Sequence, residues 1–164
     1  MRAETARKFT DSQPHLLLHM IALIQRVSEA RVRVAGRTVG EIGPGILALI
    51  GVERADEGPQ VARLLERVLG YRIFPDEAGR MNRSLADTGG GLLLVPQFTL
   101  AADTRKGTRA GFSTAAEPER AAALFERLVR EARAVHPQVA CGEFGAEMQV
   151  SLTNEGPVTF WLQS

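Results

Sequence analysis

Apolar residues recur along this chain in two periods, one typical of strands and one typical of helices. A period near 3.6 residues indicates an amphipathic helix, whereas strict alternation indicates a half-buried strand. The helical period predicts one helix with Asp56 as its N-cap, and a second that begins near Glu117 and ends before Pro137. The apolar faces are Val61, Leu64, Leu65, Val68 and Leu69 in the first helix, and Ala121, Leu124, Phe125, Leu128, Val129, Ala132 and Val135 in the second.

Strand patterns cover most of the remaining chain. Residues 46–52 form a continuous apolar run, which predicts a central strand buried on both faces. Residues 20–34 read as one long strand or two, followed by a turn at 35–37 and a return strand. Together the patterns predict a single mixed α/β domain, with two helices packed on a largely antiparallel or barrel-like sheet. Further strands are predicted at 71–74, 92–100, 138–141, 147–153 and 158–163, a polar loop at 80–84 and a long irregular loop at 101–114.

Gly156 and Pro157 separate the last two predicted strands. Turn chemistry alone favours a hairpin turn there, because Gly tolerates positive φ and Pro fixes its own φ. A cis peptide bond is also accessible, since a bond before proline prefers trans by only about 0.5–1 kcal/mol.

Composition is that of an ordinary globular protein, with 45% hydrophobic and 24% charged residues. The single cysteine, Cys141, excludes an internal disulfide framework, so we expect a reducing, cytoplasmic location. No apolar run approaches the length of a membrane span. Residues 1–19 make a poor secretory signal, and we expect a poorly ordered extension there, ahead of a folded domain at 20–164.

A net charge of +1 gives no general argument for nucleic-acid binding. Three cations nevertheless gather in the glycine-bearing loop 101–114, where they could grip phosphates. These are Arg105, Lys106 and Arg109.

The usual catalytic sets are missing. His15 and His19 lie near the N-terminus, and His136 ends a predicted helix, where an imidazole commonly complements the helix dipole. No Ser-His-Asp or Cys-His signature, metal-ligand spacing or phosphate-binding glycine motif is found. An enzyme with this sequence would therefore depend on backbone groups or on its substrate for most of the chemistry.

The predicted strand 92–100 carries two polar residues at its end. Period two places Gln97 and Thr99 on the same face. Pro96 removes a donor, so the strand must be frayed or at an edge, and free N–H groups beyond it could face a ligand. The alternative is a strand that simply runs out to the surface.

Two motifs resemble those of the D-aminoacyl-tRNA deacylase family. They are Val95-Pro96-Gln97-Phe98-Thr99-Leu100-Ala101-Ala102-Asp103-Thr104 and Asn154-Glu155-Gly156-Pro157-Val158-Thr159, and the resemblance extends over residues 20–164. It implies a homodimer that hydrolyses the ester linking a D-amino acid to the 3′ end of tRNA, and also glycyl-tRNA mischarged on tRNA-Ala. It implies chiral proofreading in translation, without a cofactor or metal and without a membrane or DNA as partner.

The resemblance also implies residue roles. Gly156 and Pro157, joined by a cis bond, would enter the partner's pocket and reject L-amino acids, with Arg26 fixing their orientation and Asn154 beside them. Gln97, Phe98 and Thr99 would line the ester, with N–H groups near Phe98 and the 2′-hydroxyl of the terminal adenosine in the mechanism, or Thr99 as the nucleophile. Phe144 and Met148 would lie near the adenosine.

One position departs from the family pattern, because Pro96 stands where the family usually has Ser. Pro-Gln at this point is similar to an animal paralogue with relaxed chiral selectivity and a trans Gly-Pro bond. Phe98 and the second motif match the strict branch, which we therefore favour. A non-catalytic RNA-binding module on the same fold is the second alternative.

Overall fold

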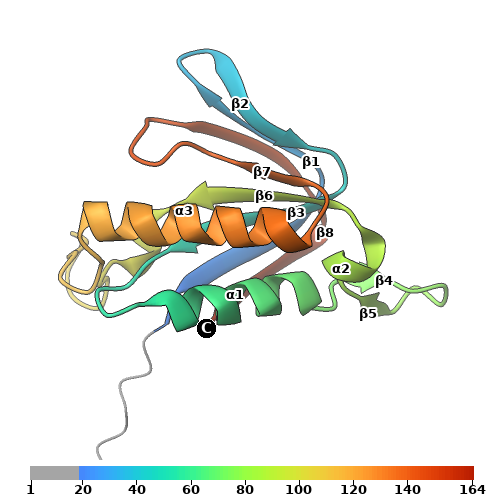
Figure 1. The fold of residues 1–164 in the computed structure, drawn as a ribbon, viewed down its shortest axis with the longest axis horizontal. Coiled ribbons are helices and arrows are strands. Elements are labelled where there is room, and N and C mark those ends of the chain that lie inside the picture. The colour runs from blue at the N-terminus through green and yellow to red at the C-terminus, as the bar shows by residue number, and fades with distance from the viewer. Residues whose placement is uncertain (1–18) are drawn as a thin grey trace, which may run out of the picture.

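A computed structural model describes residues 19–164 (Figure 1), so the predicted extension at 1–19 lies almost entirely outside the described residues. Strands and helices follow one another as one mixed α/β domain. The strands are β1 (Ile21–Val34), β2 (Arg37–Ile42), β3 (Gly45–Gly51), β4 (Phe74–Pro75), β5 (Met81–Arg83), β6 (Gly91–Pro96), β7 (Val139–Cys141) and β8 (Gln149–Gln163). The helices are α1 (Gly58–Gly70), α2 (Leu85–Thr88), α3 (Pro118–Val135) and the 3-10 helix η1 (Phe98–Ala101).

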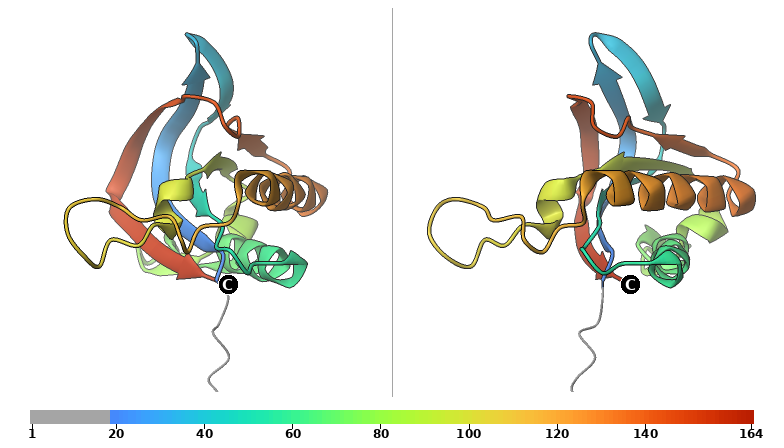
Figure 2. Two further views of the ribbon diagram at one scale, coloured as in Figure 1. Left: turned by 90° about the vertical axis from the view of Figure 1, so that its left-hand side faces the viewer. Right: turned by 60° about the vertical axis from the view of Figure 1, so that its left-hand side comes forward.

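The long strand β1 organises the main sheet. It pairs antiparallel with β2, β3 and β8, while β3 pairs with β6 and β6 with β7 in parallel. The sheet curls until β2 approaches β7, which gives a nearly closed barrel (Figure 2). Gly40 permits this approach, because a Cβ there would lie 2.6 Å from the carbonyl oxygen of Cys141. The barrel-like prediction is confirmed, and most of the pairing is antiparallel as predicted, with β3–β6 and β6–β7 as the parallel exceptions.

Helices α1 and α3 lie side by side on one face of the sheet (Figures 1 and 2). Their apolar faces meet β1, β3 and β6 in the main core, which confirms both predicted helical stripes except at Val135, which is 67% exposed at the end of α3. A second, smaller core fills the curled part of the sheet, with Val27, Val32, Leu47, Leu93 and Val95 among its buried members. None of the helices within residues 19–164 is long and apolar enough to cross a membrane.

Several local predictions are wrong. Helix α1 is capped by Glu57 rather than Asp56, whose side chain is buried. The predicted strand 71–74 is reduced to β4, which pairs with β5 inside the predicted polar loop. The short helix α2, capped by Ser84, was not predicted and adds a third helix to the two expected. These segments are short, so local patterns carry little information about them.

The predicted hairpin turn at Gly156 and Pro157 is also wrong. Strand β8 does not reverse, because both halves pair antiparallel with β1, through Gln25 with Thr159 and Val27 with Asn154. Residues 155–158 lie opposite Arg26 alone, so they form a bulge in one continuous strand. We call residues 155–158 the β8 bulge.

Candidate active site

The first sequence motif ends a strand and then turns. Gln97 makes the last ladder bond of β6, where its N–H donates to the carbonyl of Ile50 at 2.7 Å. The predicted strand 92–100 is therefore too long, because residues 98–101 form η1. Pro96 still pairs with Ile50 of β3, but β7 pairs with β6 only as far as Leu94, so Pro96 lies at an edge as predicted. Gly51 gives η1 room against β3, because a Cβ there would lie 2.9 Å from the Cβ of Leu100.

Within this turn the polar side chains meet each other. The Gln97 amide Nε2 donates to the Thr99 hydroxyl over 2.5 Å. Phe98 is 60% exposed, and its ring centroid lies 5.3 Å from that of Phe112. In the described part of the chain, the N–H groups of Phe98 and Thr99 have no hydrogen-bond partner, as is usual for the first donors of a helical turn. These two donors can therefore bind a ligand.

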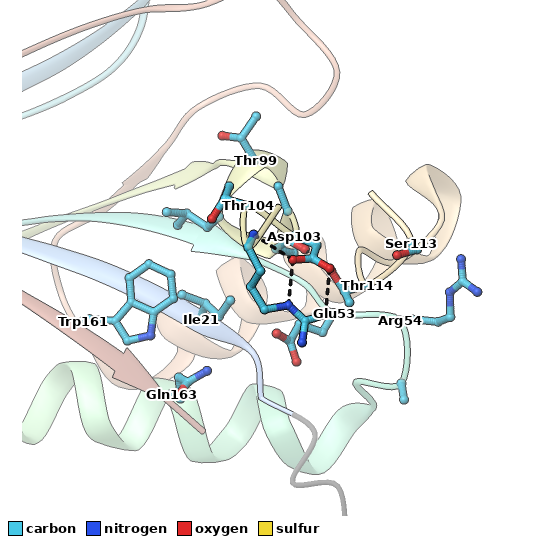
Figure 3. Close-up of a pocket in the computed structure, with 15 residues that line it drawn as sticks. Ile21, Glu53, Arg54, Thr99, Asp103, Thr104, Ser113, Thr114, Trp161 and Gln163 are labelled. Atoms are coloured by element: carbon cyan, nitrogen blue, oxygen red, sulfur yellow. Dashed lines mark hydrogen bonds and ion pairs between the residues drawn. The ribbon is translucent and has the colours of Figure 1, made fainter. Parts of the chain in front are cut away.

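A cavity of about 820 Å³ borders Thr99 (Figure 3). Trp161 of β8 forms one side of it and is 50% exposed, while Thr99 lies across from Glu53 in this view. No histidine of residues 19–164 lines the cavity. The other lining residues are Ile21, Arg54, Ala55, Leu100, Ala101, Ala102, Asp103, Thr104, Arg105, Ser113, Thr114 and Gln163.

The basic loop, residues 101–114, is closed at its base by main-chain hydrogen bonds. Main-chain bonds of 2.7 and 2.9 Å join Asp103 to Gly111. Arg105 donates to both carboxylate oxygens of Asp103, from Nε at 2.8 Å and Nη2 at 2.7 Å. These bonds hold the pKa of Asp103 well below its usual range and raise the pKa of Arg105. Lys106 and Arg109 have no ion-pair partner among residues 19–164, so they carry the uncompensated charge of a neighbouring cavity of about 550 Å³.

Phe144 and Met148 follow β7 and emerge at the same sheet edge as η1. Because β6 and β7 are parallel, their carboxyl ends lie together, the usual place for a ligand in such sheets. Gly142 lies close to Pro96, since a Cβ on it would be 3.4 Å from the proline Cδ. The Met148 sulfur accepts from the N–H of Glu143 at 3.4 Å. The structure thus places Met148 beside Gly142 and Phe144 against Phe125 of α3.

The β8 bulge is held by two side chains. Arg26 donates from Nε to the carbonyl of Glu155 at 3.0 Å, and from Nη1 to the carbonyl of Ile73 at 2.7 Å. Asn154 accepts from the N–H of Val158 and donates to the Thr159 hydroxyl, both at 2.9 Å. Between them, the Gly156–Pro157 bond is cis. Gly156 has a φ of 141°, which side chains rarely tolerate.

The bulge and η1 lie at opposite ends of β3. Arg26 is level with Ile46, whereas η1 packs against Gly51, five residues further along the strand. At about 3.3 Å per residue, this separates them by roughly 17 Å. Within one chain, Gln97, Phe98 and Thr99 therefore lie with the basic loop, and Arg26, Asn154, Gly156 and Pro157 lie apart from them.

The remaining candidates for chemistry are structural. His136 ends α3 as expected, but it is buried, with its ring Nε2 2.6 Å from the carbonyl oxygen of Gly90. Cys141 is half-buried on β7. Across residues 19–164, no group of three His, Cys, Asp or Glu side chains is placed to hold a metal ion.

The sequence model of the family described as D-Tyr-tRNA(Tyr) deacylase matches residues 23–163. The chain belongs to this family. A D-aminoacyl-tRNA deacylase from Thioalkalivibrio sulfidiphilus is 73% identical over 144 residues, which cover 88% of this chain and 97% of that protein. One from Alkalilimnicola ehrlichii is 68% identical over 145 residues, with the same coverage of each chain.

Two solved structures share the fold of this deacylase family member. One is described as c-Myc DNA unwinding element binding protein. It is 34% identical, with a TM-score of 0.85 and coverage of 88% of this chain and 99% of that one. The other, a probable eukaryotic D-amino acid tRNA deacylase, is 20% identical with a TM-score of 0.76, over 90% and 100% of the two chains. The second likeness concerns the fold alone.

Residues that sequence reasoning missed lie mainly on the rim of the large cavity. Trp161 is exposed and its neighbour Leu162 is buried, as alternation along a strand predicts. A tryptophan on the exposed face of a strand was therefore the available signal. Phe112 packs on Phe98, and Arg54 lines the cavity from the segment after β3. Neither has a local signal, because their positions depend on contacts between distant segments.

Proposed function

We propose that this protein hydrolyses the ester bond of D-aminoacyl-tRNA, releasing the D-amino acid and free tRNA. The observation that carries the proposal is the pair of unpartnered N–H groups at Phe98 and Thr99, of which Thr99 lines a cavity without histidine. The relatives named D-aminoacyl-tRNA deacylase, one of them 73% identical, support the choice of substrate. Glycyl-tRNA mischarged on tRNA-Ala belongs to the same proposal, because glycine has no side chain to exclude.

Backbone groups and the substrate would share the chemistry. When water attacks an ester carbonyl placed against the N–H groups of Phe98 and Thr99, negative charge forms on the carbonyl oxygen. These two fixed donors would stabilise that charge. The 2′-hydroxyl of the terminal ribose would direct the attacking water, because no carboxylate or imidazole of the described residues is hydrogen-bonded to the Thr99 hydroxyl. Gln97 would hold the Thr99 hydroxyl in place through their hydrogen bond.

Chiral selection would require a second copy of the chain. Strand β8 pairs only with β1 within residues 19–164, so its outer edge is free, and Val150, Leu152 and Trp161 are exposed along it. Free edges of this kind favour association. Since the β8 bulge lies far from η1 of its own chain, we propose that Gly156 and Pro157 reach the partner's cavity. Arg26 and Asn154 would set their orientation.

The rest of the tRNA end would contact the surrounding surface. Phe144 and Met148 would border the terminal adenosine, at the shared carboxyl edge of β6 and β7. Lys106 and Arg109 would bind phosphates from the basic loop, with Arg105 shaping that loop through Asp103.

The test gives purified protein D-Tyr-tRNA and L-Tyr-tRNA and measures release of each amino acid. We expect hydrolysis of the D form and little of the L form. Equal hydrolysis of both would instead favour the paralogue with relaxed selectivity, which the chain resembles at Pro96. Binding of tRNA without release of either amino acid would favour the non-catalytic RNA-binding module.

A further inference from the structure

A second cavity, of about 440 Å³, lies between α3 and the segment after β7, and of the predicted site residues described above it shares only Phe144. Cys141 and Gly142 line it, together with Phe125 and the half-buried ring of Phe144. The two phenylalanine rings lie 6.4 Å apart between centroids. The other lining residues are Glu126, Val129, Arg130, Arg133 and Glu143.

The charged residues of this cavity face it from one side of α3. Glu126, Arg130 and Arg133 are spaced at i, i+4 and i+7, so they share one face of the helix. Arg130 has no ion-pair or hydrogen-bond partner in the described chain, and Arg133 contacts only the Cys141 sulfur, at 3.7 Å from Nη2. Both guanidinium groups are exposed and free to bind an anion.

These groups suit a single nucleotide. An aromatic ring with nearby arginines is the usual surface for an unstacked base and its phosphate. A carboxylate accepts hydrogen bonds from the exocyclic amino group of cytosine. The cavity supplies all three, with Arg130 and Arg133 as the cations and Glu126 and Glu143 as acceptors. Phe144 is the ring, and it would stand between the adenosine and the nucleotide in this cavity.

Its position fits a substrate held at η1. Gly142 lines the cavity and lies against Pro96, three residues before Thr99. Three residues span at most about 10 Å. A nucleotide chain anchored by its ester at Thr99 can therefore enter this cavity with the next residue or two.

We propose that this cavity binds the cytidine that precedes the terminal adenosine of the tRNA, with its phosphate against Arg130 and Arg133. The proposal rests on the proposed function for the placement of the ester at η1. It adds a subsite that reads the 3′ end beyond the adenosine.

A series of D-tyrosyl esters of increasing length tests the subsite. The substrates are D-tyrosyl-adenosine, the D-tyrosylated trinucleotide CCA and D-Tyr-tRNA, with kcat/KM measured for each. Arg130→Ala and Arg133→Ala should each lower kcat/KM for the trinucleotide and tRNA by about fivefold to tenfold, which is typical for loss of a charge-assisted contact. Both should leave D-tyrosyl-adenosine unchanged. Arg63→Ala is the matched control, because Arg63 is exposed on α1 and pairs only with Glu66.

Cys141 provides a direct binding readout, since it is the only cysteine and lines the cavity. The trinucleotide CCA, with no amino acid attached, should slow alkylation of Cys141 by iodoacetamide, and adenosine monophosphate should not. Equal effects of the variants on all three esters, or equal protection by both ligands, would overturn the subsite while leaving the deacylase intact. Protection by CCA in a protein that hydrolyses no ester would overturn the proposed function and leave the binding site.

Discussion

The Gln97 side-chain amide donates a hydrogen bond to the Thr99 hydroxyl at 2.5 Å, at the rim of the large cavity. The amide cannot take a proton, so the Thr99 hydroxyl keeps its own hydrogen. An activated Thr nucleophile needs an adjacent base, and the hydroxyl has none among its hydrogen-bond partners in the described chain. The bond therefore positions Thr99 rather than activating it.

Thr99→Ala should keep substantial activity, within about tenfold of the parent kcat, because the N–H donors beside it belong to the backbone. The measurement is single-turnover hydrolysis of D-Tyr-tRNA. Thr104→Ala, in the same cavity, controls for the loss of a hydroxyl. Near-complete loss in Thr99→Ala, with an unchanged circular dichroism spectrum, would instead identify Thr99 as the nucleophile.

Arg26→Ala should damage activity more than stability. The side chain donates hydrogen bonds to the carbonyls of Glu155 and Ile73, so its removal leaves Glu155 of the β8 bulge without this bond. We expect kcat/KM for D-Tyr-tRNA to fall by roughly tenfold or more, on the order of 1.4 kcal/mol of positioning free energy. Arg33→Ala, on the exposed side of the same strand, is the control. Equal activity of the two variants would contradict a role for Arg26 in placing the bulge.

Lys106→Ala combined with Arg109→Ala should raise KM for D-Tyr-tRNA and weaken its dependence on salt. Each lost phosphate contact should reduce the slope of log KM against log salt by about 0.7 to 0.9. Arg105→Ala makes a useful comparison, because Arg105 is already paired with Asp103. Its removal should change the slope less. An unchanged slope in the double variant would exclude these residues from the RNA contact.

The sequence was a good guide wherever local pattern decides structure. The apolar stripes of α1 and α3 were predicted because each records burial against the main core, and the continuous run of β3 because its two faces contact the two cores. The β8 bulge could not be predicted in this way. It exists because β1 continues past it and because Arg26, far away in sequence, holds it, so a local Gly-Pro looked like a hairpin turn.

The same reason explains the error at η1. Alternation was extended through Pro96 to Thr99, but Gly51 lets the chain turn tightly against β3 instead. Gln97 and Thr99 do meet, though through a hydrogen bond within a turn rather than as neighbours on one face of a strand. The motifs located the candidate site, while its geometry depended on contacts between distant segments.

Asp56 makes folding stability depend on pH in the acid range. The side chain is fully buried; its Oδ2 accepts from the N–H of Glu53 at 2.7 Å, and its Oδ1 has no partner in the described chain. Burial, chiefly, raises the pKa of Asp56 from 3.8 to about 6, and the Glu53 charge adds to the rise. The Glu53 N–H bond, His19 and Arg120 oppose it. The folded state thus binds this proton more tightly than the unfolded state.

A raised pKa in the folded state gives stability that is present at pH 4 and is lost as pH rises through about 6. Asn at position 56 cannot ionise, so Asp56→Asn is spared this loss. The difference in unfolding free energy, variant minus parent, should therefore increase by about 1–3 kcal/mol from pH 4 to pH 7. Urea denaturation at several pH values measures this difference. Asp76→Asn is the contrasting control, because hydrogen bonds led by that of Asn82 lower the pKa of Asp76 in its exposed turn. As pH rises from the acid range, the unfolding free energy of Asp76→Asn should therefore fall relative to that of the parent. Parallel pH profiles for Asp56→Asn and the parent would mean that Asp56 is as easily ionised in the folded chain as in the unfolded one.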